Sequence, residues 1–159
     1  MELTDHEILR YNRQISLKAV DFDGQEKLKE SRVLIVGAGG LGCAASQYLA
    51  SAGVGKIILV DFDTISLSNL QRQILYTDAD MGKPKAEVAK VRLQSINPNI
   101  EVQAVVKKCD DAEFAELIRQ VDIVVDCTDN VDVRNQLNFQ CFQQRRPLVS
   151  GSAIRFEGQ

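Results

Sequence analysis

A β-branched run that leads straight into a glycine loop constrains this 159-residue sequence more than any other feature. Arg32–Val36 (RVLIV) is the continuous apolar run typical of a strand buried on both faces. Gly37–Gly42 (GAGGLG) follows at once and opens a helical stretch, Leu41–Ala52, which ends at Gly53. Glycines at this G-x-G-x-x-G spacing permit a tight turn, let phosphates approach backbone N–H groups, and let the helix pack on the strand. This order of elements predicts a nucleotide-binding α/β unit.

Strand and helix patterns then alternate along the rest of the chain. The further predicted strands are Lys56–Asp61, Glu101–Val106, Asp122–Asp126 and Leu148–Ser150. The predicted helices run from Pro84 to just before Asn97, from Ala112 to Gln120, and from Val131 to Gln144. The alternation predicts an α/β, Rossmann-like fold with a mostly parallel sheet and helices on both faces.

The chain is expected to form one domain in three parts. Residues 1–31 carry short helices: Thr4 and Glu7 fit a capping box that starts a helix carrying Arg10 and Arg13, and a second helix lies near residues 25–30. Residues 32–150 form the nucleotide-binding core. Residues 151–159 read as the start of a further strand without a stop signal, so we expect a fragment that is truncated before its C-terminal part.

Composition excludes several classes of protein. The net charge of −3 provides no electrostatic footprint for nucleic acid. No apolar run approaches the roughly 20 residues that span a membrane, and the N-terminus lacks the layout of a signal peptide. The four cysteines show no C-x-x-C pairing, which predicts neither disulfides nor a zinc site. These features together predict a cytoplasmic protein.

An acidic residue follows the glycine loop at the spacing typical of a ribose-binding carboxylate. Asp61 ends the second predicted strand, nineteen residues after Gly42, where a carboxylate can accept ribose hydroxyl hydrogen bonds. Its alternative role is a turn residue at a strand end, beside Asp63. Loop and carboxylate together indicate a nucleotide with a ribose but do not say which. Cys43 could be a thiol activated by the helix N-terminus, although a small packing residue is the preferred interpretation.

Two polar groups beyond the second strand suit a polyphosphate. In Leu67–Gln73, Asn69 and Arg72 lie three apart and share one face of a helical turn. Lys85 lies at the start of the helix that begins at Pro84. Arginine and lysine are the groups that answer concentrated negative charge. Charge alone, however, would favour ordinary surface cations at both positions.

The segment Asp126–Asn130 (DCTDN) follows the fourth predicted strand at the same edge of the sheet as the glycine loop. A carboxylate there could hold Mg²⁺ together with phosphate oxygens. Asp129 or Asn130 could equally cap the next helix, and the residues alone leave these roles even. The sequence has no Ser/His pair, no H-E-x-x-H, no Walker lysine and only one histidine, His6. Chemistry by positioning and charge stabilisation would suit such a chain.

At this point a family resemblance becomes visible over essentially the whole chain. The motifs that carry it are RYNRQ (10–14), DGQ (23–25), VLIVGAGGLG (33–42), SAGVG (51–55), DFD (61–63), SNLQRQ (68–73), KPK (83–85) and DCTDN (126–130). Together they resemble the family of MoeB, ThiF and the ubiquitin-activating enzymes. DFDGQ, NVDVRNQLN and SGSAIRFEGQ look most like the MoeB branch, the molybdopterin-synthase adenylyltransferases, with the ThiF branch of thiamine synthesis as the close alternative.

The resemblance implies ATP with Mg²⁺, and transfer of AMP to a carboxylate with release of pyrophosphate. The acceptor would be the C-terminal glycine of a ubiquitin-like sulfur carrier, the small subunit of molybdopterin synthase, in molybdenum cofactor biosynthesis. The family also continues into a segment with two C-x-x-C pairs for structural zinc, and those ligands are absent from this sequence. The alternatives of another class are an NAD-dependent oxidoreductase and a non-catalytic nucleotide-binding module.

The resemblance also implies a role for each matching residue. Gly39 and Gly40 would contact phosphates and Asp61 the ribose. Lys85 would reach the phosphate chain, and Asp129 would hold Mg²⁺ with Asn130 beside it. The segment that would line the nucleotide comprises Ser68, Asn69, Leu70, Gln71 and Arg72, with Asn69 and Arg72 facing phosphates. Arg13 would reach across a homodimer into the neighbouring site, so that Arg13, Arg72 and Asp129 form the implied catalytic set.

Overall fold

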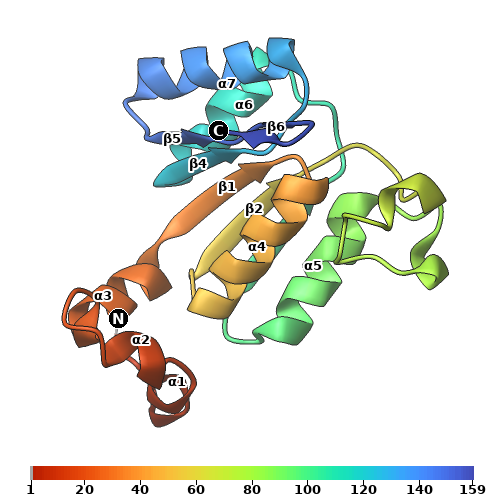
Figure 1. Cartoon of the computed structure of the whole chain (residues 1–159). Helices are drawn as coiled ribbons and strands as arrows, with labels where there is room; N and C mark the ends of the chain where they lie inside the picture. Colours follow the sequence, from red (N-terminus) through yellow and green to blue (C-terminus); the bar gives the residue numbers. More distant parts are fainter. Residues whose placement is uncertain (1) are drawn as a thin grey trace.

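The computed structural model describes residues 2–159 and contains one five-stranded parallel sheet (Figure 1). The strands lie in the order β3-β2-β1-β4-β5, so that the first strand of the chain is the central one. The strand bounds are β1 Arg32–Val36, β2 Lys56–Val60, β3 Glu101–Val105, β4 Ile123–Asp126 and β5 Leu148–Ser150. The predicted strands are confirmed within one residue at each end, and the sheet is parallel throughout.

Seven α-helices and two short 3₁₀ helices accompany the strands in the described chain. The α-helices are α1 Asp5–Arg10, α2 Asn12–Ile15, α3 Asp21–Glu30, α4 Gly40–Ala52, α5 Lys85–Ile96, α6 Asp111–Arg119 and α7 Val131–Gln144. The 3₁₀ helices are η1 Leu67–Asn69 and η2 Asp78–Asp80. Among residues 2–159, no helix has both the length and the apolar character needed to cross a membrane.

Alternate residues of each central strand feed separate hydrophobic cores on the two faces of the sheet. On one face, Ile35 belongs to the core cluster that includes Cys43 of α4 and Leu93 of α5. On the other face, Leu34 belongs to the cluster that includes Phe114 of α6 and Leu137 of α7. This double burial explains why β1 is an unbroken apolar run, and it confirms the predicted Rossmann-like arrangement with helices on both faces (Figure 1).

The N-terminal helices differ from the single helix predicted to carry Arg10 and Arg13. The capping box of Thr4 and Glu7 is confirmed, but α1 ends at Arg10 and Arg13 lies in the separate helix α2. Tyr11 divides them. Its buried ring packs on the left-handed Gly53 so closely that a Cβ at Gly53 would lie 2.6 Å from the ring, and this tertiary contact overrides the local helical pattern.

Side-chain amides join these N-terminal helices to the C-terminal end of α4. Gln14 Nε2 donates to Ala52 O at 3.0 Å, and Gln25 Nε2 donates to the same carbonyl at 2.9 Å. Asn97 Nδ2 donates both to Ala50 O and to the hydroxyl of Tyr11. The last carbonyls of a helix have no partner within the helix, so these donors both satisfy α4 and fix the position of α2.

Two segments depart in detail from the sequence expectation. Pro84 was predicted as the first helical residue but is the extended N-cap, and Lys85 begins α5. Residues 151–159 were predicted to enter one further strand. They instead form a hairpin of β6 (Ala153–Ile154) and β7 (Glu157–Gly158), antiparallel and separate from the main sheet, which turns through the left-handed Arg155.

The long connection between β2 and α5 is held by the buried carboxylate of Asp80. Thr77 donates to it from its hydroxyl at 2.9 Å and from its backbone N–H at 3.0 Å, and Arg92 donates from Nη2 at 3.1 Å. Lys83 lies 3.3 Å away. The hydrogen bond from the hydroxyl of Thr77 does most to hold the pKa of Asp80 well below its ordinary value, and the other donors add to this shift. Burial opposes it.

We predict that Asp80→Asn lowers the free energy of unfolding by roughly 2 kcal/mol at pH 7, the scale of hydrogen bonds to a charged group. Because the folded pKa is depressed, this contribution is complete above the unfolded pKa and is lost as pH falls through the folded value. Urea unfolding between pH 7 and pH 3 should therefore show the difference shrinking in acid. Asp78→Asn, in the same 3₁₀ helix but exposed, is the control; a difference that is constant with pH would contradict the assignment.

Candidate functional site

The glycine loop, Gly37–Gly42, turns sharply between the C-terminal ends of β1 and β4. Gly37 has φ +96°, and a Cβ there would lie 2.8 Å from the carbonyl oxygen of Cys127. A Cβ at Gly42 would lie 1.9 Å from the carbonyl oxygen of Gly37. No larger residue fits either position, so the predicted roles of the motif in a tight turn and in close helix packing are confirmed.

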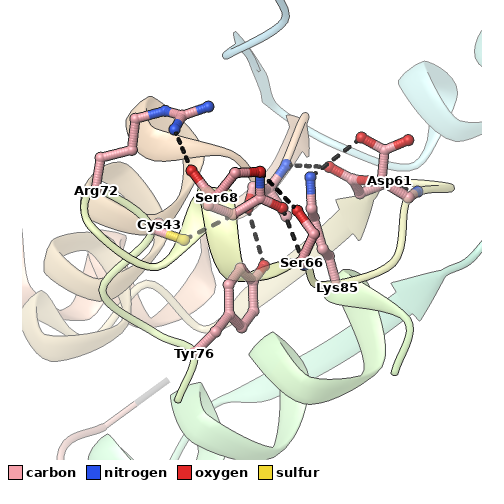
Figure 2. A network of polar contacts seen from close by, with 10 residues as sticks. Cys43, Asp61, Ser66, Ser68, Arg72, Tyr76 and Lys85 are labelled. Carbon is pink, nitrogen blue, oxygen red and sulfur yellow. Dashed lines mark hydrogen bonds and ion pairs between the residues drawn. The ribbon is translucent and has the colours of Figure 1, made fainter. Parts of the chain in front are cut away.

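The carboxylate of Asp61, just beyond β2, fixes the shape of this loop. Its Oδ2 accepts the backbone N–H of Ala38 at 2.7 Å, and its Oδ1 accepts the N–H of Asp63 at 2.8 Å. Tyr76 donates its hydroxyl to the carbonyl of Ala38 at 2.9 Å, so that Ala38 is held on both sides (Figure 2). A carboxylate has about four lone-pair sites, which leaves Asp61 able to accept ribose hydroxyls as well. That ribose contact stays a prediction.

Burial raises the pKa of Asp61, and the N–H groups of Ala38 and Asp63 and the charge of Lys85 oppose this rise. Burial likewise raises the pKa of Cys43, whose thiol donates to Ala38 O at 3.4 Å. A raised thiol pKa is the opposite of activation, so Cys43 is the packing residue that the sequence favoured. Burial also raises the pKa of Cys127 to about 11, with the neighbouring charge of Asp126 adding to the shift.

Lys85 is not the surface cation that charge alone suggested. Its side chain is only 6% exposed, and its Nζ donates to Asp63 Oδ2 at 3.1 Å. Burying an ammonium group costs free energy unless the group is paired. The burial of Lys85 and its pairing with Asp63 therefore distinguish it from an ordinary surface lysine. Figure 2 shows Lys85 pointing toward the same region as Asp61.

Arg72 lies on the other side of the glycine loop and is exposed. The structure brings it to the loop, because a Cβ at Gly40 would lie 3.5 Å from Cγ and Cδ of Arg72. Its Nη1 donates to Ser68 O at 3.1 Å, which leaves the other guanidinium donors for a ligand (Figure 2).

The rest of the predicted lining segment has mixed surroundings. Ser68 shares a hydrogen bond of 3.1 Å with the hydroxyl of Ser66, and Gln71 donates to Ser68 O. Asn69 accepts the N–H of Ser66 as part of the cap of η1. Leu70 packs against the hydrophobic core. Contact of these residues with a nucleotide remains a prediction.

In the DCTDN loop (Asp126–Asn130) the structure separates the roles that the sequence left open. Asn130 caps α7, since its Oδ1 accepts the N–H groups of Asp132 and Val133 at 2.9 and 3.1 Å. Asp129 is exposed. No group of three His, Cys, Asp or Glu side chains that could hold a metal occurs in residues 2–159. Mg²⁺ commonly takes only one or two carboxylates plus phosphates, so a single carboxylate at Asp129 fits a cation carried by a nucleotide.

Sequence reasoning missed Arg134, which holds the DCTDN loop in place. Its Nε lies 3.1 Å from Oδ2 of the fully buried Asp126, and its Nη2 donates to Thr128 O at 2.8 Å and to Gly151 O at 2.9 Å. The available signal was an arginine four residues after the helix cap Asn130. Its partners come from a strand end, a loop and a segment after β5, a combination that no local pattern indicates.

Arg13 is not brought to the glycine loop within the chain. It is exposed on α2, and its side chain forms no hydrogen bond or ion pair with residues 2–159. Its neighbour Gln14 contacts Ala52 at the far end of α4 from the loop. A helix rises about 1.5 Å per residue, so the length of α4 lies between Arg13 and the loop.

The parallel sheet and the glycine loop after its central strand together define an α/β protein of the Rossmann-like class. Residues 11–159 match the model of the ThiF family, and the chain belongs to that family.

Two curated relatives and one solved structure place the chain within this family. It is 66% identical to the molybdopterin-synthase adenylyltransferase of Escherichia coli over 158 residues. This alignment covers 99% of the chain and 64% of that relative. Identity to the sulfur carrier protein ThiS adenylyltransferase of Escherichia coli is 44% over 157 residues, covering 99% of the chain and 62% of the relative. The chain thus spans less than two thirds of the length of either relative.

One of the similar solved structures is that of the Escherichia coli tRNA N6-threonylcarbamoyladenosine dehydratase TcdA in complex with ATP. The TM-score is 0.88 at 27% identity, over 98% of this chain and 65% of that one. The predicted fold class is therefore confirmed by an independent structure as well as by the sheet itself.

We predict that Arg134→Ala lowers the free energy of unfolding by roughly 2 kcal/mol, because the buried carboxylate of Asp126 loses its cation. The effect is smaller than that of breaking a fully buried ion pair, since the side chain of Arg134 is partly exposed. Arg119→Ala, which breaks an exposed pair with Glu116, should change it by less than about 1 kcal/mol. Urea unfolding of the two variants measures both. Equal effects would show that Arg134 is only a surface cation.

Proposed function

We propose that this chain is the ATP-binding part of an adenylyltransferase that activates a protein carboxylate. The acceptor is the C-terminal glycine of a ubiquitin-like sulfur carrier, the small subunit of molybdopterin synthase, in molybdenum cofactor biosynthesis. One observation carries the proposal: Arg72 lies against Gly40 of a glycine loop that opens a helix, and the buried Lys85 lies near the Asp61 carboxylate that holds this loop (Figure 2). The 66% identity to a molybdopterin-synthase adenylyltransferase supports the choice of acceptor.

The proposed binding mode follows from the charges at the loop. Backbone N–H groups near Gly39 and Gly40, with the positive end of the α4 dipole, bind phosphate oxygens. Lys85 and Arg72 balance the remaining negative charge, and Asp61 accepts the ribose hydroxyls. Asp129 holds Mg²⁺, which when bound neutralises part of the phosphate charge.

The proposed chemistry is attack of the carrier carboxylate on the α-phosphorus of ATP. A carboxylate oxygen–phosphorus bond forms, and the bond from the α-phosphorus to the bridging oxygen breaks, releasing pyrophosphate. The nucleophile is already ionised at neutral pH, so no general base is required, in keeping with a single histidine in the sequence. Arg72 stabilises the charge that gathers on the leaving pyrophosphate.

A homodimer completes the proposal. Arg13 lies a helix length from the loop of its own chain, and the family resemblance assigns it to the neighbouring site. We place the reaction in the cytoplasm, since four free cysteines suit a reducing compartment. The second candidate function is adenylation of the thiamine sulfur carrier, favoured by the 44% identity to a ThiS adenylyltransferase. An NAD-dependent oxidoreductase would leave Lys85 and Arg72 without a purpose.

ATP–pyrophosphate exchange by the full-length protein tests the proposal. We predict exchange with the molybdopterin-synthase small subunit as acceptor and much less with the thiamine carrier. Arg72→Ala should slow exchange roughly a hundredfold, since one donor to transition-state charge is worth about 3 kcal/mol. Lys90→Ala, which removes a cation from α5 outside the loop, should not slow it. The reverse carrier preference would establish the second candidate, and a loss under threefold would remove Arg72 from the mechanism.

Subunit mixing tests the assignment of Arg13. We predict that Arg13→Ala and Asp129→Ala are each inactive alone but regain activity when their subunits exchange. In a mixed dimer, the chain with intact Asp129 receives the intact Arg13 of the other chain, so one of the two sites is complete. The measurement is exchange activity after co-incubation, with each variant mixed with itself as the control. If Arg13 acts within its own chain, mixing restores nothing.

A further inference from the structure

The side chain of Gln73 is buried beside the glycine loop without a hydrogen-bond partner. The residue is 3% exposed, and its Oε1 has no partner in the described chain. Its backbone is satisfied: the N–H donates to Asn69 O at 3.0 Å, and the carbonyl accepts from Tyr76 N at 3.2 Å. A buried amide that lacks partners destabilises a fold. Within residues 2–159 the amide nitrogen Nε2 has no hydrogen-bond partner either, so the donor of this carboxamide is available to a ligand that carries an acceptor.

Other buried amides in the protein are bonded, which makes the contrast informative. Gln25 is fully buried, yet its nitrogen donates to Ala52 O and its oxygen accepts from Gln14. Asn97 is equally buried and uses both its nitrogen and its oxygen. Of the buried carboxamides in residues 2–159, only that of Gln73 has neither end bonded.

The position of the amide nitrogen indicates what could bond to it. Nε2 of Gln73 lies 3.6 Å from the point that a Cβ on Gly39 would occupy. Gly39 is the N-cap of α4 and offers no side-chain cap to the first turn of that helix. The stem of Arg72 lies against the next glycine, Gly40. Gln73 and Arg72 therefore line consecutive residues of the loop, at the N-terminal end of a thirteen-residue helix.

We propose that Gln73 is a phosphate-binding residue of this site, donating from Nε2 to a phosphate oxygen of the bound nucleoside triphosphate; this rests on the proposed function. A neutral donor complements Arg72 and Lys85 because it adds a directed bond without further like charge beside two cations. The site thereby holds phosphate with backbone N–H groups, two cations and one carboxamide.

Isothermal titration of the chain with Mg·ATP, and with adenosine as a competitor, tests this. Gln73→Met keeps the length and volume of the side chain but removes its donor. We expect the dissociation constant for Mg·ATP to rise at least about tenfold, the scale of one bond to a charged group. The constant for adenosine, which has no phosphate, should stay within about twofold. The thermal midpoint of the unliganded variant should stay the same or rise, because an unbonded amide has gone.

Gln144→Met is the matched control. Gln144 also has a buried Oε1 without a partner, but its Nε2 donates to Ala115 O between α6 and α7, away from the loop. This variant should bind Mg·ATP as the unsubstituted chain does. The same result for Gln73→Met would overturn the proposal.

An equal loss of ATP and adenosine binding would also overturn it, since the role would then be shaping of the loop. If Gln73→Met does not fold, Gln73→Glu is measured instead, and it must lose ATP far more than adenosine through repulsion of phosphate. Failure of both variants to fold would make Gln73 structural. If the unsubstituted chain itself did not bind Mg·ATP, the proposed function would fail, a result separate from all of these.

Discussion

The hydrogen bond of 2.7 Å from Ala38 N to the Asp61 carboxylate is the constraint on which the site depends. It joins the end of β1 to the end of β2 across the glycine loop, while Cys127 after β4 abuts Gly37 from the other side. The loop is therefore held by contacts from three neighbouring strands in addition to the glycines of its own sequence. Its backbone N–H groups are therefore held in place before any ligand binds.

Two cations lie around this loop: Arg72 against Gly40, and Lys85, which is paired with Asp63. Lys85 begins α5, so its charge lies at the positive end of its own helix dipole, an unfavourable place for a cation. It is also almost completely buried, and its partner Asp63 is half-exposed. The chain tolerates this arrangement next to the N-terminus of α4, where an anion is favoured as well. Stability alone would not select such a position for a lysine, whereas binding of a polyanion would.

The sequence predicted the sheet well because β1, β2 and β4 are buried on both faces, and such strands need unbroken apolar runs. It predicted the glycine loop because the steric demands at Gly37 and Gly42 leave no other residue. It failed where distant contacts decide the outcome. The break between α1 and α2 depends on Tyr11 packing against Gly53, and the burial of Lys85 depends on how the connection after β2 folds back. Neither contact has a local signature.

Helix α4 separates the glycine loop from the N-terminal helices that carry Arg13. Its N-terminus forms the glycine loop, and its C-terminal carbonyls are bound by Gln14, Gln25 and Asn97, so the N-terminal helices are attached rigidly at the opposite end (Figure 1). Thirteen residues of helix correspond to about 20 Å. A fully extended arginine side chain spans roughly a third of that distance, because fewer than about ten bonds separate its Cα from the guanidinium nitrogens. Arg13 could reach the phosphates of its own chain only if the amide contacts at the C-terminal end of α4 broke. Those contacts hold Tyr11 and α2 in the fold, so a role for Arg13 at the phosphates requires a second chain.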